Sequence, residues 1–121
     1  EKIVASASRR FIIVADASKV VRRLGRFPLP VEVIQMAAPL VARKLTELEM
    51  RPAMRHRNDG SAYVTDEGNY ILDCACGEME DPAAVAAAVR GLVGVVEHGL
   101  YLGMAERALI ADGAEVRELV R

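Results

Sequence analysis

A polar turn that could bind an anion follows an apolar run near the start of the chain. Residues Phe11–Ala15 are all apolar, and Asp16, Ala17, Ser18 and Lys19 come directly after them. An apolar run without alternation is typical of a parallel strand that is buried on both faces. In sheets of such strands, ligands collect beyond the carboxyl ends. The pattern therefore places Lys19 where binding residues tend to lie, although pattern alone favours an ordinary surface charge for both Lys19 and Glu1.

The cysteines and histidines do not form a recognised reactive site. Cys74 and Cys76 are separated by one residue and lack the second cysteine or histidine pair that a zinc site requires. On a strand, both would share a face with Leu72, which predicts small buried hydrophobic side chains. His56 and His98 lie far apart in the sequence, and neither has the nearby nucleophile and orienting group of a catalytic triad.

Local clusters of charge are interpreted as surface charge. Glu78, Glu80 and Asp81 lack the alternating oxygens of a calcium loop, and they precede a predicted helix, where acidic side chains are favourable. Two groups of arginines without interleaved aromatic residues are expected at the surface or at a subunit contact: Arg22, Arg23 and Arg26, and Arg51, Arg55 and Arg57.

The composition excludes several classes of protein. Hydrophobic residues make up 52% of the 121 residues, which excludes a disordered chain. A net charge of −1, with 4% aromatic residues and no Trp, argues against nucleic acid or an anionic membrane surface as partner. No apolar run approaches the ~20 residues needed to cross a bilayer, and no signal peptide is recognised. Two cysteines are too few for a disulfide scaffold, so we expect a cytoplasmic protein.

The predicted elements form an α/β protein with an inserted module. A helix ending near Arg10 and the strand Phe11–Ala15 precede the breaker segment Gly25–Pro30. The pattern β-α-β-β-β-α-β follows, and two further strands end the chain. The strands are predicted at 31–36, 52–57, 62–65, 70–76, 95–102, 104–111 and 115–120, and the helices at 39–50 and from Pro82, with Asp81 as N-cap and Gly94 as the stop.

The periodicity also predicts which side chains face the core of this module. Three sets are expected on buried faces: Val31, Val33 and Gln35; Ala38, Val41, Leu45 and Leu48; and Val85, Val89 and Leu92. The predicted fold class is α/β, comprising part of a doubly wound Rossmann-like sheet and an inserted ferredoxin-like α+β domain. We assign residues 1–28 to the Rossmann-like domain, 29–102 to the ferredoxin-like domain, and 103–121 to strands that return to the first domain. Because the chain begins at Glu1, in a helix-like stretch, we expect the natural protein to begin earlier.

Seven segments, spread in order over nearly the whole chain, carry a resemblance to a known family: Glu1–Ala5, Phe11–Lys19, Leu24–Ile34, Val64–Asp73, Asp81–Pro82, Gly94–Tyr101 and Asp112–Gly113. Together they look like ribose-5-phosphate isomerase, type A. The resemblance implies an aldose–ketose isomerase that interconverts ribose 5-phosphate and ribulose 5-phosphate in the pentose phosphate pathway. It also implies a Rossmann-like domain with an inserted ferredoxin-like domain, no metal or organic cofactor, and homodimers or homotetramers.

Two site residues carry over from the resemblance. Glu1, followed by Lys2 and Ile3, matches the family's catalytic glutamate, and Lys19 matches the substrate-binding lysine that closes the Asp-Ala-Ser-Lys turn. The family's phosphate-binding Gly-Thr-Gly loop, its Asp-Gly-Ala-Asp-Glu segment and its Lys-Gly-Gly-Gly segment match nothing in this chain. We therefore expect these residues alone to lack appreciable activity and to expose the apolar run Phe11–Ala15.

Two interpretations from other functional classes stay open at this point. The chain could be a non-catalytic piece whose stable part is the ferredoxin-like module, acting in oligomer contact. It could also be a ligand-binding regulatory module of similar topology.

Overall fold

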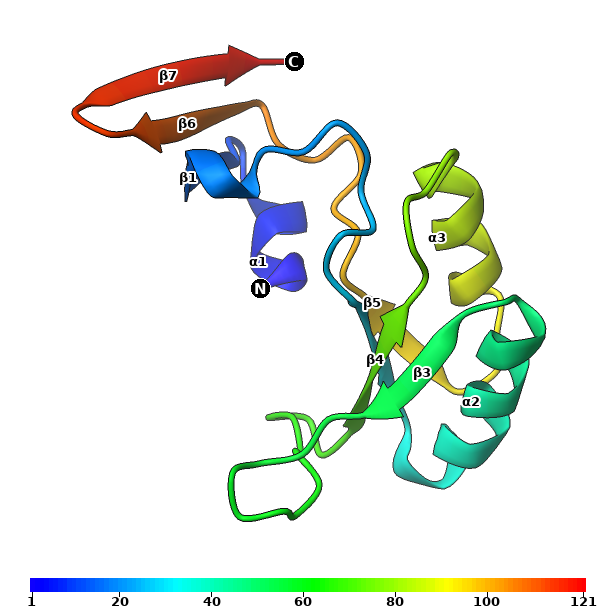
Figure 1. Cartoon of the computed structure of the whole chain (residues 1–121). Helices are drawn as coiled ribbons and strands as arrows, with labels where there is room; N and C mark the ends of the chain where they lie inside the picture. The colour runs from blue at the N-terminus through cyan, green and yellow to red at the C-terminus, as the bar shows by residue number, and fades with distance from the viewer. The chain divides into compact units, whose positions relative to one another are not determined.

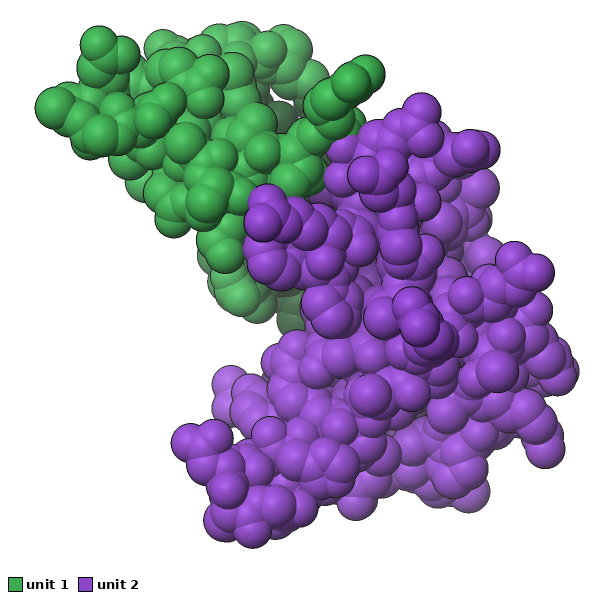
Figure 2. All heavy atoms as spheres, viewed as in Figure 1, with its two compact units in different colours: residues 1–22, 101–121 green, residues 23–100 purple.

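The computed structural model describes residues 1–121, which divide into two compact units (Figure 2). Unit 1 comprises Glu1–Arg22 and Tyr101–Arg121, and unit 2 comprises Arg23–Leu100. The observed divisions follow residues 22 and 100, whereas the sequence placed the domain boundaries after residues 28 and 102. Both units combine helices with sheets, so the fold class is α/β, as predicted.

Unit 1 is built from the two ends of the chain. Its elements are α1 (Lys2–Ala7), β1 (Ile12–Asp16), the 3-10 turn η1 (Ala17–Lys19), β6 (Arg107–Asp112) and β7 (Glu115–Val120). The strands form one sheet in the order β1-β6-β7, with β1 parallel to β6 and β6 antiparallel to β7 (Figure 1). The β6–β7 hairpin turns at Gly113, whose φ of 62° lies in the left-handed region that glycine adopts readily.

An ion pair joins the starting ends of β1 and β6. Arg10 donates two hydrogen bonds to the carboxylate of Glu106, at 3.0 and 2.8 Å, and the backbone N–H of Glu106 donates to the carbonyl of Phe11 at 2.8 Å. The hydrogen bonds from Arg10 lower the pKa of Glu106 to about 2. This two-point contact joins two segments that lie far apart in the sequence.

The apolar run in β1 is largely exposed in this chain. Ile12, Ile13 and Val14 are 38%, 37% and 76% exposed. The prediction that both faces of this strand are buried is therefore wrong for these 121 residues, because the six-residue helix α1 is too short to cover both faces of the sheet of unit 1. The expectation that residues 1–121 alone expose this run is confirmed.

Unit 2 has the strand and helix order of a ferredoxin-like module. Its elements are β2 (Leu29–Val33), the 3-10 turn η2 (Gln35–Ala37), α2 (Ala38–Glu47), β3 (Arg51–Met54), β4 (Tyr70–Ala75), α3 (Pro82–Arg90) and β5 (Val95–His98). The four strands are all antiparallel, in the order β3-β4-β2-β5. Both helices lie on one face of this sheet (Figure 1).

The predicted strand at residues 62–65 is absent. Only an isolated bridge joins His56 to Ala62. The hydroxyl of Thr65 donates to Glu32 at 2.9 Å, and the side-chain amide of Asn69 donates to the same oxygen at 2.9 Å. These polar contacts fold the segment as a loop, so unit 2 has the β-α-β-β-α-β order with one strand fewer than predicted.

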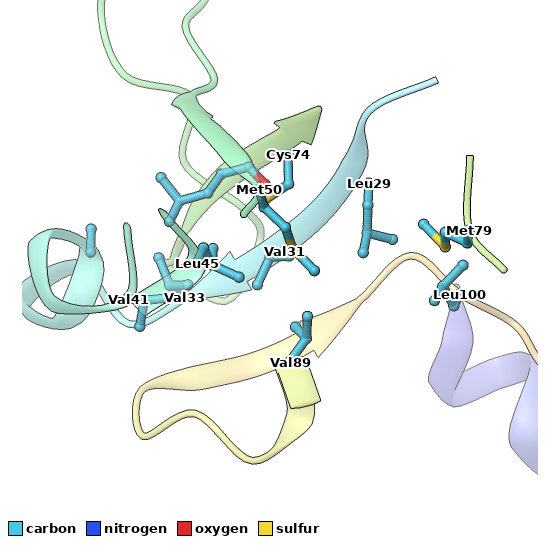
Figure 3. Packing of buried hydrophobic residues seen from close by; sticks show 12 residues of the cluster. Leu29, Val31, Val33, Val41, Leu45, Met50, Cys74, Met79, Val89 and Leu100 are labelled. Carbon is cyan, nitrogen blue, oxygen red and sulfur yellow. Dashed lines mark hydrogen bonds between the residues drawn. The ribbon is translucent and has the colours of Figure 1, made fainter. Parts of the chain in front are cut away.

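The core of unit 2 lies between its sheet and its two helices (Figure 3). Alternate residues of β2 point into it, and Leu29, Val31 and Val33 are buried. Predicted residues from the other elements join them: Ala38, Val41 and Leu45 of α2, Leu72 and Cys74 of β4, and Val89 of α3. Val85 and Leu92 are partly buried against this cluster. The apolar periodicity thus identified most of the core.

Three details of the core differ from the prediction, each at the end of an element. Gln35 is exposed in η2, since β2 ends at Val33. Leu48 is 41% exposed because α2 ends at Glu47, and buried Met50 follows Glu49, whose φ of 64° reverses the chain. Helix α3 ends at Arg90, with Gly91 rather than Gly94 as its C-cap.

The N-terminal end of α3 agrees with the prediction. The carboxylate of Asp81 accepts a hydrogen bond from the backbone N–H of Ala84 at 3.1 Å, and Pro82 opens the helix. Aspartate satisfies an otherwise unpaired N–H at this position, and proline has no N–H to lose.

Truncation of Leu45 should strongly destabilise unit 2. Leu45 is fully buried, so Leu45→Ala leaves a cavity, and we expect a loss of about 2–5 kcal/mol in the free energy of unfolding. Leu48→Ala is the matched control, because this leucine is half exposed three residues further along, and it should cost about 1 kcal/mol or less. Urea unfolding of both variants measures the difference. Equal losses would show that Leu45 does not contribute to the core.

Candidate functional site

The predicted anion-binding turn lies at the carboxyl end of β1. Asp16 is the last residue of this strand and the N-cap of η1, and Lys19 is the last residue of η1. One carboxylate oxygen of Asp16 accepts hydrogen bonds from the backbone N–H of Ser18, at 2.9 Å, and from the Ser18 hydroxyl. The backbone N–H of Val20 donates to the carbonyl of Ala17 at 3.2 Å and closes the turn. The parallel strand therefore ends in a polar turn that presents an exposed lysine.

The same hydrogen bonds set the charge of the turn. The hydroxyl of Ser18, and then its backbone N–H, lower the pKa of Asp16, and the positive charge of Lys19 lowers it further. Asp16 is therefore ionised throughout the neutral range, and the turn pairs a fixed carboxylate with a lysine.

An unrelated loop of unit 2 contains the same local geometry. Asp59 accepts from the backbone N–H of Ser61 at 2.9 Å and from its hydroxyl at 2.6 Å, and these bonds lower the pKa of Asp59. That loop follows no parallel strand and carries no lysine. The turn geometry alone therefore does not mark a site; its place at the end of β1 and its lysine distinguish it.

Glu1, the second predicted site residue, lies at the start of α1. It is the N-cap of this helix and is exposed, and its carbonyl accepts a hydrogen bond from the backbone N–H of Ala5 at 2.9 Å. The ammonium of Lys2 lies 5.0 Å from the centre of the Tyr101 ring, which in turn lies 6.0 Å from the ring of Phe11. These contacts attach the first turn of α1 to both segments of unit 1. Glu1 and Lys19 both lie in the first of these segments, Glu1–Arg22.

The prediction of buried structural cysteines holds for Cys74 in β4, whereas Cys76 lies just beyond the end of this strand and is only partly buried. Cys74 is fully buried, and burial raises the pKa of its thiol to about 12. Burial also raises the pKa of Cys76. No group of three or more histidine, cysteine, aspartate or glutamate side chains is placed to hold a metal ion.

One histidine and one of the clustered arginines also make structural contacts. Nδ1 of buried His98 accepts a hydrogen bond from the backbone N–H of Leu100 at 3.1 Å. Arg55 donates two hydrogen bonds to Asp73, at 2.9 and 2.7 Å, and lies 5.6 Å from the centre of the Tyr63 ring. These contacts give His98 and Arg55 structural roles.

Sequence reasoning missed a pocket in unit 2. It has a volume of about 310 Å³, and its largely apolar lining includes Pro39 of α2, Pro52 and Met54 of β3, and Tyr70 of β4. No local motif could have revealed it, because the residues come from separate segments and are brought together only by the fold.

A family model described as ribose 5-phosphate isomerase A (phosphoriboisomerase A) matches residues 1–115. The chain belongs to this family. Ribose-5-phosphate isomerase A of Roseiflexus sp. (strain RS-1) is 52% identical over 120 residues, a match that covers 98% of this chain and 52% of that relative. The corresponding protein of Natronomonas pharaonis is 46% identical, over 97% of this chain and 53% of the relative. The resemblance noted in the sequence is therefore confirmed.

Solved structures of ribose 5-phosphate isomerase A have the same fold. The structure from Methanocaldococcus jannaschii superposes with a TM-score of 0.92 at 31% identity, covering 99% of this chain and 53% of that one. A D-ribose-5-phosphate isomerase in complex with phospho-erythronic acid superposes with a TM-score of 0.93 at 27% identity, with the same coverage. The chain thus spans about half the length of the relatives it matches. None of its helices is long and apolar enough to cross a membrane.

Removal of the Ser18 hydroxyl should raise the pKa of Asp16. The pKa of Asp16 is lower in the folded state than in the unfolded state. The hydrogen bond therefore stabilises the folded state at any pH above the unfolded-state pKa, and this stabilisation is lost as the pH falls through the folded-state pKa. Ser18→Ala should therefore make stability less dependent on pH in the acidic range. NMR titration of the Asp16 carboxyl carbon measures the pKa directly.

The matched control for this prediction is Ser61→Ala. It should raise the pKa of Asp59 and leave that of Asp16 unchanged, because each serine donates only to its own aspartate. An Asp16 pKa that stays at its wild-type value in Ser18→Ala would show that the hydroxyl does not hold the carboxylate.

Proposed function

We propose that these residues form part of an aldose–ketose isomerase that interconverts D-ribose 5-phosphate and D-ribulose 5-phosphate. The observation that carries the proposal is the match of the isomerase A family over residues 1–115, which includes both Glu1 and the Asp16–Lys19 turn. The phospho-erythronic acid in a relative's complex supports a sugar phosphate as the substrate class. Because the chain spans about half of its relatives, the activity is proposed for a protein that also carries the rest of the family's sequence.

The reaction moves one proton between adjacent carbons, and in this proposal Glu1 carries it. A carboxylate removes the C2 proton of the aldose to form an enediolate, a proton passes from the O2 hydroxyl to O1, and the same carboxyl group delivers its proton to C1. Such a base must be accessible and must have no competing partner that holds it away from substrate. The exposed position of Glu1, at the start of α1 and without a side-chain cap bond, supports this role.

Lys19 binds the phosphate or a sugar oxygen of the substrate in this proposal. A lysine ammonium acts as a point charge toward an anion, and remote binding of the phosphate fixes the reacting carbons. Its place beyond the carboxyl end of a parallel strand, in the same unit as Glu1, supports the role. The family further leads us to propose a cytoplasmic homodimer or homotetramer whose reaction needs no metal or organic cofactor.

Replacement of Glu1 by glutamine should abolish most of the turnover. The amide keeps the shape of the side chain but cannot accept a carbon-bound proton, and loss of a general base typically costs ~10²–10⁴ in rate. We expect kcat to fall by about this factor in the full-length enzyme, with little change in KM. Turnover of ribose 5-phosphate and exchange of its C2 proton with solvent measure the effect.

Glu115→Gln is the matched control for this variant. Glu115 is an exposed glutamate of unit 1, at the start of β7, and its replacement should leave both rates unchanged. If Glu1→Gln isomerises and exchanges at close to the wild-type rate, Glu1 is not the base.

Replacement of Lys19 by alanine should weaken substrate binding more than turnover. A cation that faces phosphate stabilises the ground state and the transition state alike, so KM rises while kcat changes less. Steady-state kinetics of full-length Lys19→Ala measures both constants, with Lys44→Ala as the control, since Lys44 is an exposed lysine that pairs with Glu47 on α2. A large fall in kcat at unchanged KM would place Lys19 at the reacting oxygen instead.

A further inference from the structure

Lys19 is carried by a segment with little structure of its own. The turn η1 has three residues, Ala17–Lys19, and Lys19 lies exposed at its end. A short 3-10 turn has poorer hydrogen-bond geometry than an α-helix, and a lysine stem has many rotamers. A substrate-binding role for Lys19 therefore requires neighbouring groups that hold the turn in one conformation.

Asp16 connects this turn to the sheet. Its backbone pairs with Ala111 of β6, at the end of the parallel ladder. Its carboxylate accepts from the backbone N–H of Ser18, at 2.9 Å, and from the Ser18 hydroxyl. One residue thus belongs to the sheet through its backbone and holds the turn through its side chain.

The charge of Asp16 acts on Lys19 as well. The pKa of Asp16 is lowered first by the hydrogen bonds from Ser18 and further by the charge of Lys19, so the ionised carboxylate and the ammonium attract each other at neutral pH. An ionised carboxylate repels a phosphate dianion. Asp16 is therefore suited to act through the turn and Lys19 and is unsuited to contact the phosphate itself.

We propose that Asp16 is a positioning residue whose carboxylate fixes the Ala17–Lys19 turn and so presents Lys19 to the substrate. The inference rests on the substrate-binding role proposed for Lys19.

A double-mutant cycle in the full-length enzyme tests the proposal. Asp16→Ala should raise KM for ribose 5-phosphate by about tenfold, since misplacement of a positioning group can cost up to ~10²-fold. In a Lys19→Ala background the same change should alter KM by less than about twofold, because the residue that Asp16 positions is already gone. Asp16→Asn keeps an acceptor oxygen but loses the charge, and its effect on KM should lie between those of wild type and Asp16→Ala.

Asp59→Ala is the matched control for this cycle. Asp59 holds the same kind of turn in unit 2, so its loss should leave KM and kcat unchanged. Two results would refute the positioning role while leaving the proposed function intact, provided that Lys19→Ala raises KM. In the first, Asp16→Ala does not change KM. In the second, Asp16→Ala changes KM by the same factor whether Lys19 is present or replaced by alanine. If Lys19→Ala leaves KM and kcat unchanged, both the binding role of Lys19 and the positioning role of Asp16 are wrong.

Backbone relaxation decides the positioning role even if the full-length protein does not isomerise ribose 5-phosphate. Asp16→Ala should increase the mobility of the Ser18 and Lys19 amides on the nanosecond timescale, whereas Asp59→Ala should leave them as in wild type. Amides of Ser18 and Lys19 that stay as rigid in Asp16→Ala as in wild type would overturn the proposal whatever the activity.

Discussion

The parallel pairing of β1 with β6 is the constraint on which unit 1 depends. Residues Ile12–Asp16 pair with Arg107–Ala111. Bringing these two strands together closes the long segment of chain between them into a loop, which costs conformational entropy. Unit 2 reduces this cost, because its antiparallel β2 and β5 pair Val31 with His98, and Gly99 donates to the carbonyl of Pro30 at 2.9 Å. The chain therefore leaves unit 1 and returns to it through neighbouring strands. A module inserted in this way can fold around its own core while leaving the surrounding sheet in register.

The same pairing determines where the candidate site lies. The last pair of the ladder contains Asp16, whose carboxylate begins the turn that ends at Lys19. At the other end of the ladder, Arg10 and Glu106 form a two-point ion pair beside Phe11, whose ring lies against Tyr101. Tyr101 also contacts Lys2, the residue after Glu1. The contacts of Lys2 with Tyr101 and the Asp16–Lys19 turn thus involve opposite ends of the same strand pair.

Local pattern predicted most of the helices, strands and core because these depend on neighbouring residues. The burial of Val31 and Val33 on one strand face and the Asp81 cap are read directly from the sequence. One error arises where a distant residue decides the outcome, since Glu32 binds Thr65 and Asn69 and a loop replaces a predicted strand. The other errors in the core lie at the ends of elements, as at Gln35 and Leu48. The Arg10–Glu106 pair and the pocket in unit 2 depend wholly on the fold. For the site, the pattern marked the place of Lys19, whereas only the family resemblance singled out Glu1.

We propose that the substrate site lies in unit 1, at the start of α1 and the end of β1. Titration of phospho-erythronic acid into the isotope-labelled full-length protein, followed by NMR of the backbone amides, tests it most directly. Within these 121 residues, we expect the largest saturable shifts at Glu1 and Lys2 and at Asp16–Lys19. Saturable shifts centred on the unit 2 pocket, around Pro39, Met54 and Tyr70, with the Asp16–Lys19 signals unmoved, would contradict it.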